Sequence, residues 1–233
     1  MPSTVYLIPC VIDEAAIETV PTYIIAAVKN CSVIFAENER TARRFLKSMD
    51  KQIVIDDYQW HTIHKAEQEQ IATFKQCIMA QKNIAIISEA GCPGIADPGQ
   101  ILIAVAQKMQ AIVKPLVGPS SILLALMASG MNGQQFAFVG YLPIDNNQRT
   151  KAIKELEILS SKNNSTQIFI ETPYRNNPLI ETLLKTCKPT TLLCIAAELT
   201  GANEFVQTKT IADWCKQKTD FHKKPVIFLI QSV

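Results

Sequence analysis

Glycine and histidine are scarce in this sequence of 233 residues, and the net charge is small. It has eight glycines and three histidines, and 23 basic against 21 acidic side chains leave a formal net charge of +2. So small a charge excludes a tail-like nucleic-acid binder, although it allows a local basic face. Hydrophobic residues make up 48% of the chain, which excludes a disordered or low-complexity protein.

The cysteines lack the pattern of a disulfide framework. There are seven, an odd number, with no C-x-x-C pair, and most lie in apolar runs. We therefore expect reduced core cysteines in a cytoplasmic protein. The first residues lack a basic region and soon reach Asp13 and Glu14, unlike a secretory signal. No apolar run reaches the ~18 residues that suggest a membrane span.

Apolar runs alternate with stretches of helical periodicity, which predicts an α/β fold with a mostly parallel sheet. Shorter connections later in the chain indicate a mixed sheet there. Prolines and glycines at 115–119 predict an N-terminal lobe over 1–116 and a C-terminal lobe over 117–233. Strands are expected at 4–9, 32–36, 53–55, 84–88, 111–114, 136–139, 166–171, 190–196, 205–208 and 226–230. Helices are expected at 14–29, 39–48, 65–81, 100–110, 120–129, 148–160, 176–186 and 211–218.

Seven of the eight glycines lie between positions 91 and 140, and three of them fall in S-E-A-G-C-P-G-I-A-D-P-G at 88–99. This segment follows the predicted strand at 84–88, and ligands of open α/β sheets bind beyond the carboxyl ends of strands. Glycines there allow a sharp turn and a close approach to a ligand. The alternative is a tight connection in which Asp97 caps the next helix and Pro98 is its first residue. The segment is neither G-x-G-x-x-G nor a Walker loop.

A second candidate is V-G-P-S-S at 117–121, which opens an apolar helix. Free N–H groups and the helix dipole favour an anion at such a position, and the serine hydroxyls add donors. Alternatively, Ser120 or Ser121 simply caps the helix.

These two segments are followed in order by G-Y-L-P at 140–143, I-E-T-P-Y-R at 170–175 and A-E-L-T at 197–200. Together the five motifs resemble signatures of the tetrapyrrole (corrin/porphyrin) methylase superfamily. They are most similar to the branch of small-subunit ribosomal RNA cytidine 2′-O-methyltransferases. The resemblance runs from about Val5 to Ile230.

The resemblance implies a two-lobed methyltransferase, usually a homodimer, with S-adenosylmethionine (SAM) in a cleft between the lobes. The N-terminal lobe would carry the glycine-rich cofactor loop and the C-terminal lobe would complete the cleft. By motif position, the residues expected at the cofactor are Ile12, Ala90, Gly91, Cys92, Ile95, Ser120, Ser121, Glu171, Leu199 and Val226.

The sequence departs from the branch at several positions. The first loop, P-x-G-N-L in the branch, has no glycine here. A-E-D-T-R becomes A-E-N-E-R at 36–40, an aspartate becomes Glu89, and a histidine becomes Tyr174. The cofactor motifs are therefore better matched than the motifs expected to face the substrate.

Methyl transfer from a sulfonium is an in-line displacement, so alignment can provide most of the catalysis. A ribose hydroxyl would also gain from a general base, whereas an already nucleophilic acceptor need not. The sequence does not choose among the carboxylates of the matched motifs, which are Glu37, Glu89, Asp97, Glu171 and Glu198. The catalytic candidates are Glu37, Arg40, Glu89 and Arg175, and the two arginines are expected to contact an anionic substrate.

Four cations share one face of the helix predicted at 39–48: Arg40, Arg43, Arg44 and Lys47. Their mutual repulsion suggests an anionic partner such as RNA phosphate. The alternative is a solvated face neutralised by acidic neighbours.

Two other features have structural interpretations as well. His61 and His64 form H-x-x-H without further ligands at metal-binding spacing, so we expect a surface or loop role and no metal site. Tyr58 and Trp60 either stack on a base or serve the core.

The sequence therefore favours a SAM-dependent methyltransferase that 2′-O-methylates ribose in ribosomal RNA, in a cytoplasmic homodimer without membrane association. Two alternatives are open. One is methylation of a tetrapyrrole-like or other small acceptor, and the other is a catalytically lapsed SAM-binding module that regulates or assembles with partners.

Overall fold

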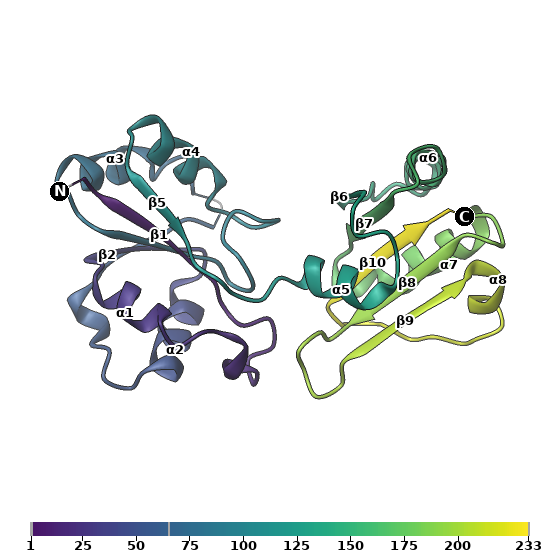
Figure 1. Ribbon diagram of the computed structural model, residues 1–233, viewed down its shortest axis with the longest axis horizontal. Helices are drawn as coiled ribbons and strands as arrows, with labels where there is room; N and C mark the ends of the chain where they lie inside the picture. The colour runs from purple at the N-terminus through teal and green to yellow at the C-terminus, as the bar shows by residue number, and fades with distance from the viewer. Residues whose placement is uncertain (1, 65, 233) are drawn as a thin grey trace. The chain divides into compact units, whose positions relative to one another are not determined.

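The computed structural model describes residues 2–64 and 66–232, which form two units, Met1–Ser120 and Ser121–Val233 (Figure 1). Each unit has one five-stranded sheet with helices on both faces. None of the helices formed by the described residues is long and apolar enough to cross a membrane.

The first unit has a parallel sheet with the strand order β3-β2-β4-β1-β5. Its strands are β1 (Thr4–Ile8), β2 (Val33–Ala36), β3 (Gln59–Thr62), β4 (Ile84–Ile87) and β5 (Ile112–Pro115). Every residue of β2 and β4 is buried, as expected for continuous apolar runs in a sheet covered on both faces.

Two helices cover each face of this sheet (Figure 1). One face packs against α1 (Ile24–Lys29) and α2 (Glu39–Met49), and the other against α3 (Ile71–Met79) and α4 (Gln100–Lys108). The amphipathic pattern of α2 buries Ala42, Phe45 and Leu46 and leaves its basic side chains outside. Two short 3-10 turns, η1 (Ile17–Thr19) and η2 (Ile55–Asp57), complete the unit.

Several predicted elements of this unit were wrong. The helix expected at 14–29 begins only at Ile24, because Pro21 cannot donate the hydrogen bond that a helix interior needs. The strand expected at 53–55 is absent, and η2 lies there instead. The strand β3 was not predicted, because this edge strand is polar and contains no apolar run. The helix expected at 65–81 spans Ile71–Met79, and position 65 lies outside the described residues.

The second unit has a mixed sheet with the order β6-β7-β10-β8-β9. Among the residues that the structure describes here, only the β6–β7 pair is parallel. The strands are β6 (Phe136–Tyr141), β7 (Thr166–Ile170), β8 (Leu192–Ala197), β9 (Phe205–Thr210) and β10 (Val226–Gln231). Together the two sheets confirm the predicted α/β class, parallel in the first unit and mixed in the second.

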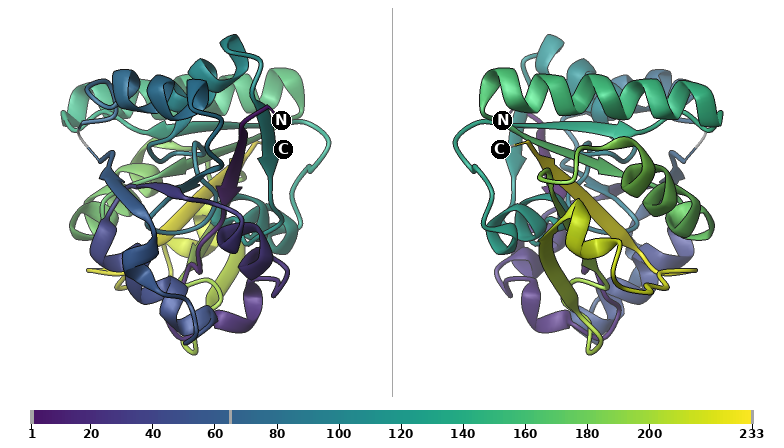
Figure 2. Two further views of the ribbon diagram at one scale, coloured as in Figure 1. Left: turned by 90° about the vertical axis from the view of Figure 1, so that its left-hand side faces the viewer. Right: turned by 90° about the vertical axis from the view of Figure 1, so that its right-hand side faces the viewer.

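Helix α5 (Ser121–Ser129) packs on one face of this sheet. The other face is covered by α6 (Asn146–Asn163), α7 (Asn176–Thr186) and α8 (Ile211–Trp214), the longest being α6 (Figure 2, right). Helix α6 begins where Asp145 accepts a hydrogen bond from the Gln148 N–H at 2.9 Å, and it ends at Asn164 in the left-handed conformation. A 3-10 turn, η3 (Pro173–Arg175), precedes α7.

All seven cysteines are free thiols, and five of them are buried. Cys215 is the exposed exception to the predicted core positions. Burial raises the pKa of the Cys31 and Cys187 thiols to about 12, so both are neutral at physiological pH.

Candidate functional site

The segment 88–99 leaves the carboxyl end of β4 and is held against the loop that follows β1. The Cys10 N–H donates a hydrogen bond to the Gly91 carbonyl at 2.8 Å, and the Ser88 hydroxyl donates to the same oxygen at 3.2 Å. Gly91, Gly94 and Gly99 all have positive φ angles, of 67°, 76° and 122°. The glycines therefore permit a backbone path that other residues rarely adopt.

The alternative interpretation, in which Asp97 caps the following helix, was wrong. Helix α4 begins at Gln100 with Gly99 as its N-cap, so Asp97 and Pro98 both precede the helix. Glu67 takes the capping role from a distant segment, because its Oε1 accepts hydrogen bonds from the N–H groups of Ile101 (2.8 Å) and Leu102 (3.1 Å). Asp97 is thus not engaged as a cap.

The loop after β5 packs against the same place. The Cys92 thiol donates a hydrogen bond to the Pro119 carbonyl at 3.5 Å. Gly118 lies against Pro9, where a Cβ at position 118 would be 2.2 Å from the Pro9 Cβ. The loops that follow β1, β4 and β5 therefore meet at the carboxyl edge of the sheet, where α/β proteins bind ligands.

Three carboxylates gather at this edge: Glu37, Glu89 and Asp97. Glu37 is buried, and its Oε2 accepts a hydrogen bond from the Glu89 N–H at 2.8 Å. Burial, together with the charges of Glu37 and Glu89, raises the pKa of Asp97 to about 7. Burial and the nearby Glu37 charge also raise the pKa of the Cys10 thiol, so that this thiol is neutral.

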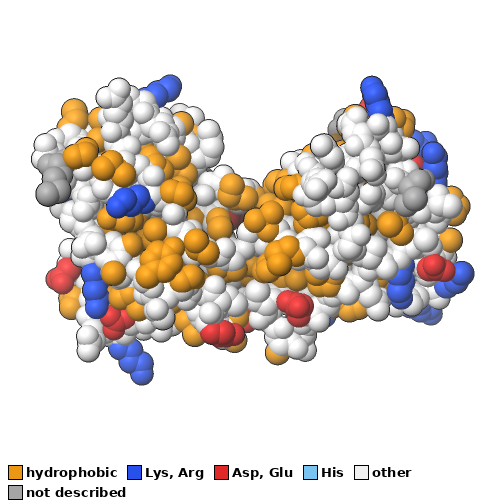
Figure 3. Space-filling model, in the orientation of Figure 1, with side chains coloured by type: hydrophobic (Ala, Val, Ile, Leu, Met, Phe, Trp, Pro, Cys, Tyr) orange, Lys and Arg blue, Asp and Glu red, His pale blue; other side chains and the backbone are white. Residues whose placement is uncertain are grey.

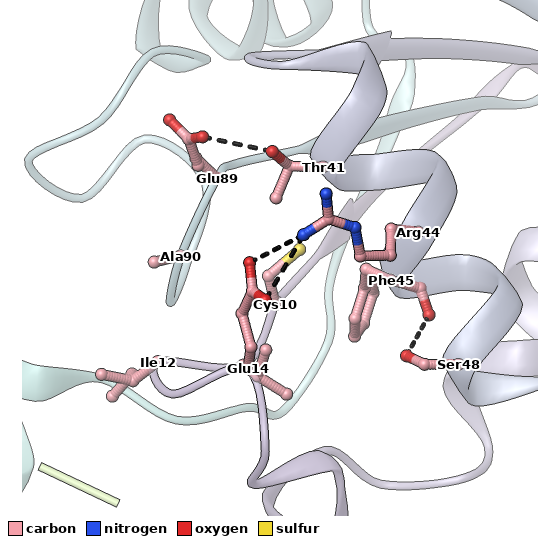
Figure 4. A pocket seen from close by; sticks show the side chains of 10 residues that line it. Cys10, Ile12, Glu14, Thr41, Arg44, Phe45, Ser48, Glu89 and Ala90 are labelled. Carbon is pink, nitrogen blue, oxygen red and sulfur yellow. Dashed lines mark hydrogen bonds and ion pairs between the residues drawn. The ribbon is translucent and has the colours of Figure 1, made fainter. Parts of the chain in front are cut away.

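A first cavity of about 270 Å³ opens between the loop after β1 and helix α2 (Figure 4). Its walls are formed by Cys10, Val11, Ile12, Glu14, Thr41, Arg44, Phe45, Ser48, Glu89 and Ala90. Arg44 and Glu14 form an ion pair of 3.1 Å in this wall. The structure thus brings two cofactor candidates, Ile12 and Ala90, to one cavity.

A second cavity of about 460 Å³ lies beside the first. It is lined by Glu37, Asn38, Glu39, Arg40, Thr62, His64 and Glu89, and Glu89 belongs to both cavities. Three of the four catalytic candidates, Glu37, Arg40 and Glu89, therefore meet here. His64 joins them although the sequence indicated only a surface or loop role for it, because the pairing of β3 with β2 places the end of β3 beside Glu37.

The fourth catalytic candidate, Arg175, is in the second unit and pairs with Glu171. Its Nη2 and Nε atoms lie 2.6 and 3.0 Å from Glu171 Oε1, and this bond raises the pKa of Arg175. Glu171 Oε2 is buried and accepts no hydrogen bond from the described residues. A buried carboxylate oxygen without a partner is costly, and this atom retains its capacity to accept a hydrogen bond.

The A-E-L-T segment is strained. Glu198 and Thr200 have φ angles of 50° and 67°, and a positive φ is a genuine outlier for a β-branched residue such as threonine. The Thr200 hydroxyl is buried and has no hydrogen-bond partner among the described residues. Such strain is characteristic of ligand-binding segments.

The other cofactor candidates differ in exposure. Leu199 and Val226 are each 5% exposed and their side chains fill the core, so a ligand would meet their backbone. Ile95 is 53% exposed on the glycine loop. Ser120 and Ser121 are partly exposed where α5 begins.

Three of the four cations on α2 have local partners. Arg43 pairs with Glu39 at 2.5 Å and lies over the Trp60 ring, and Lys47 donates to the Lys51 carbonyl. Arg44 is the third, through its ion pair in the wall of the first cavity. Within residues 2–64 and 66–232, Arg40 alone of the four makes neither a hydrogen bond nor an ion pair. Trp60 packs against the core and donates to the Ile55 carbonyl, so it has a structural role.

Comparison with protein families matches residues 24–214 to the model for "Tetrapyrrole (Corrin/Porphyrin) Methylases". The chain is similar to three proteins named "Ribosomal RNA small subunit methyltransferase I". That of Streptococcus pyogenes is 30% identical over 90% of this chain and 69% of the relative. That of Bacillus subtilis is 32% identical over 88% and 63%. That of Buchnera aphidicola (subspecies Baizongia pistaciae) is 32% identical over 64% and 51%.

The chain thus spans about half to two thirds of the length of these curated relatives. Two solved structures share the fold at 15% identity. The methyltransferase CobJ superposes with a TM-score of 0.62, covering 100% of this chain and 95% of that chain. The uroporphyrin-III-C-methyltransferase of Thermus thermophilus gives 0.56, covering 100% and 93%.

Proposed function

Since the chain belongs to the tetrapyrrole (corrin/porphyrin) methylase family, we propose that it is a SAM-dependent methyltransferase that methylates a ribose 2′ hydroxyl of ribosomal RNA. The observation that carries this proposal is the meeting of the loops after β1, β4 and β5 around Gly91. The names of the similar proteins supply the substrate class.

The residues at these loops fit SAM. Gly91 has no side chain, and the nearest atom that a Cβ at this position would meet is the Pro119 carbonyl oxygen, 3.6 Å away. In the second unit, the unpartnered Oε2 of Glu171 offers an acceptor for a hydroxyl or ammonium donor. When bound, SAM supplies a methyl group on a positively charged sulfur. We assign the remaining cofactor contacts to Ile12, Ala90, Cys92, Ile95, Ser120, Ser121, Leu199 and Val226.

The acceptor belongs in the second cavity. Arg40 provides a guanidinium that can contact a phosphate, and the partnered arginines of α2 are less available. The Glu89 backbone N–H holds the Glu37 carboxylate through the 2.8 Å bond, and Asn38 and Thr41 hold the Glu89 carboxylate, so we assign both residues to positioning. Arg175 fixes the Glu171 carboxylate through Oε1, so we assign it to positioning as well.

We also propose a cytoplasmic homodimer. The edge strand β6 exposes Phe136, Val139 and Tyr141, and α5 exposes Leu123 and Met127. Figure 3 shows exposed hydrophobic side chains around α5. Exposed apolar residues of this kind favour association. Sedimentation analysis of the purified chain tests the dimer, and a species of single-chain mass would contradict it.

The experiment that tests the activity is methyl incorporation from tritiated SAM. The purified protein is incubated with small-subunit ribosomal RNA or with a small-molecule extract, and the labelled product is digested and mapped by mass spectrometry. A 2′-O-methylated nucleotide in the RNA is expected. Label found only in small molecules would show that the substrate is a small acceptor and not RNA. SAM binding without any methyl transfer would show that the protein is a SAM-binding module without catalytic activity.

A further inference from the structure

The two histidines of the H-x-x-H motif lie in different surroundings. The His61 ring stacks on Phe35 with 4.8 Å between centroids, and burial lowers the pKa of His61. The His64 side chain is 59% exposed and lines the second cavity together with Arg40. Only His64 of this pair therefore faces the space proposed for the acceptor.

A fixed carboxylate lies beside His64. Glu37 is anchored through Oε2 by the Glu89 N–H, and its other oxygen, Oε1, lies 3.8 Å from His64 Nδ1. A carboxylate at that side favours the tautomer with its proton on Nδ1, which leaves the lone pair on Nε2. A carboxylate beside a histidine base holds the ring in this tautomer and orientation elsewhere.

The other acidic groups nearby are less suited than His64 to take the proton from the RNA hydroxyl. Glu89 Oε1 is held by hydrogen bonds from the Asn38 amide and the Thr41 hydroxyl, both 3.2 Å long. Glu39 is paired with Arg43. Asp97 lines neither of the two cavities.

We infer that His64, positioned by Glu37, is the general base that takes the proton from the acceptor hydroxyl. This inference rests on the proposed methylation of an RNA hydroxyl. The hydroxyl oxygen forms a bond to the methyl carbon while the bond from that carbon to sulfur breaks. The electron pair stays on sulfur, and the hydroxyl proton moves to His64 Nε2, from which water removes it. Catalysis by such a base contributes roughly 10²–10⁴-fold.

The activity test compares His64→Ala and His64→Gln with the control His61→Gln in single-turnover methylation of ribosomal RNA. The His64 variants should lose roughly 10²–10⁴-fold in rate while their affinities for SAM and RNA change less than about twofold. Added imidazole should restore part of the rate of His64→Ala, because it can occupy the vacated space. His61→Gln should keep its rate and lose thermal stability.

A second measurement needs neither SAM nor RNA. The ¹⁵N chemical shifts of the His64 ring report which nitrogen carries the proton. Wild type should show the proton on Nδ1, and Glu37→Gln should lose this preference while its fold, followed by circular dichroism, is kept.

The outcomes separate the two proposals. If wild type transfers no methyl group to RNA, both the proposed function and this inference fail. If wild type is active and His64→Gln keeps its rate, only this inference fails. A slow His64→Ala variant without imidazole rescue, with ring nitrogens that do not respond to Glu37→Gln, would make His64 structural and also overturn the inference.

Discussion

Gly118 and Pro9 lie so close that no side chain fits between them. A Cβ at position 118 would be 2.2 Å from the Pro9 Cβ and 2.3 Å from its Cγ. Both atoms belong to the proline ring, which cannot rotate away. This contact joins the loop after β5 to the loop after β1. The loop after β1 is joined in turn to the loop after β4 by the bridge between Cys10 and Gly91. The contact therefore sets the spacing of the loops to which we assign SAM.

Gly118→Ala should separate these loops. Overpacking of this kind costs about 1–3 kcal/mol, and we expect chemical denaturation to report a loss in that range together with weaker SAM binding. Gly133→Ala is the control, because a Cβ there meets no atom within 4 Å. Equal stability of the two variants would contradict the close contact.

Gly91→Val should abolish most SAM binding, because the side chain would occupy the space where backbone meets the ligand. The variant also strains a backbone with a φ of 67°. Gly130→Val has the same kind of strain, with a φ of 69° and open space around it, but lies outside the candidate site. Isothermal titration should therefore show weak binding only for Gly91→Val, and equal affinities in the two folded variants would remove Gly91 from the site.

Arg40 should contribute more to RNA binding than Arg43 or Arg44, because the latter two are already paired with Glu39 and Glu14. Arg40→Ala should reduce the slope of log affinity against log salt by roughly 0.7–0.9.

The control for Arg40 is the double variant Arg43→Ala/Arg44→Ala, measured for RNA affinity at several salt concentrations. For each arginine removed, this double variant should reduce the slope of log affinity against log salt by less than Arg40→Ala does. If the double variant loses two full phosphate contacts and Arg40→Ala loses none, the cations of α2 act as an extended RNA face and Arg40 is not the main contact.

Asp97 should make stability fall as the pH rises from about 4 to 7. Its pKa is raised to about 7 by burial and by the charges of Glu37 and Glu89, so the native state holds this proton over a range in which the unfolded state has released it. Above pH 7 the ionised group is unfavourable, although its partial exposure screens the cost.

Asp97→Asn should therefore raise the melting temperature at pH 8 by about 2–4 °C, the shift that 1 kcal/mol produces in a chain of this size. At pH 4 the two proteins should melt at similar temperatures. The exposed Asp56→Asn serves as the matched variant. A melting temperature of Asp97→Asn that is unchanged at both pH values would mean that the carboxyl is not destabilised in the native state.

The sequence alone determined the fold class and the position of the glycine-rich segment at 88–99. Strands β2 and β4 were visible because strands buried on both faces must be apolar throughout. The glycines of 88–99 were visible because few other residues accept their backbone angles. Pro21, which excludes one continuous helix over 14–29, was also visible in the sequence, although the apolar periodicity continues across it.

Only the tertiary structure decided what depends on segments far apart in the chain. The edge strand β3 is polar, so its pairing with β2 had no local signal, and that pairing brings His64 to Glu37. Glu67 caps α4 from 34 residues away, a role that local capping preference gave to Asp97. Neighbours along the chain set backbone conformation, whereas the partner of a charged side chain is set by the packing of the whole unit.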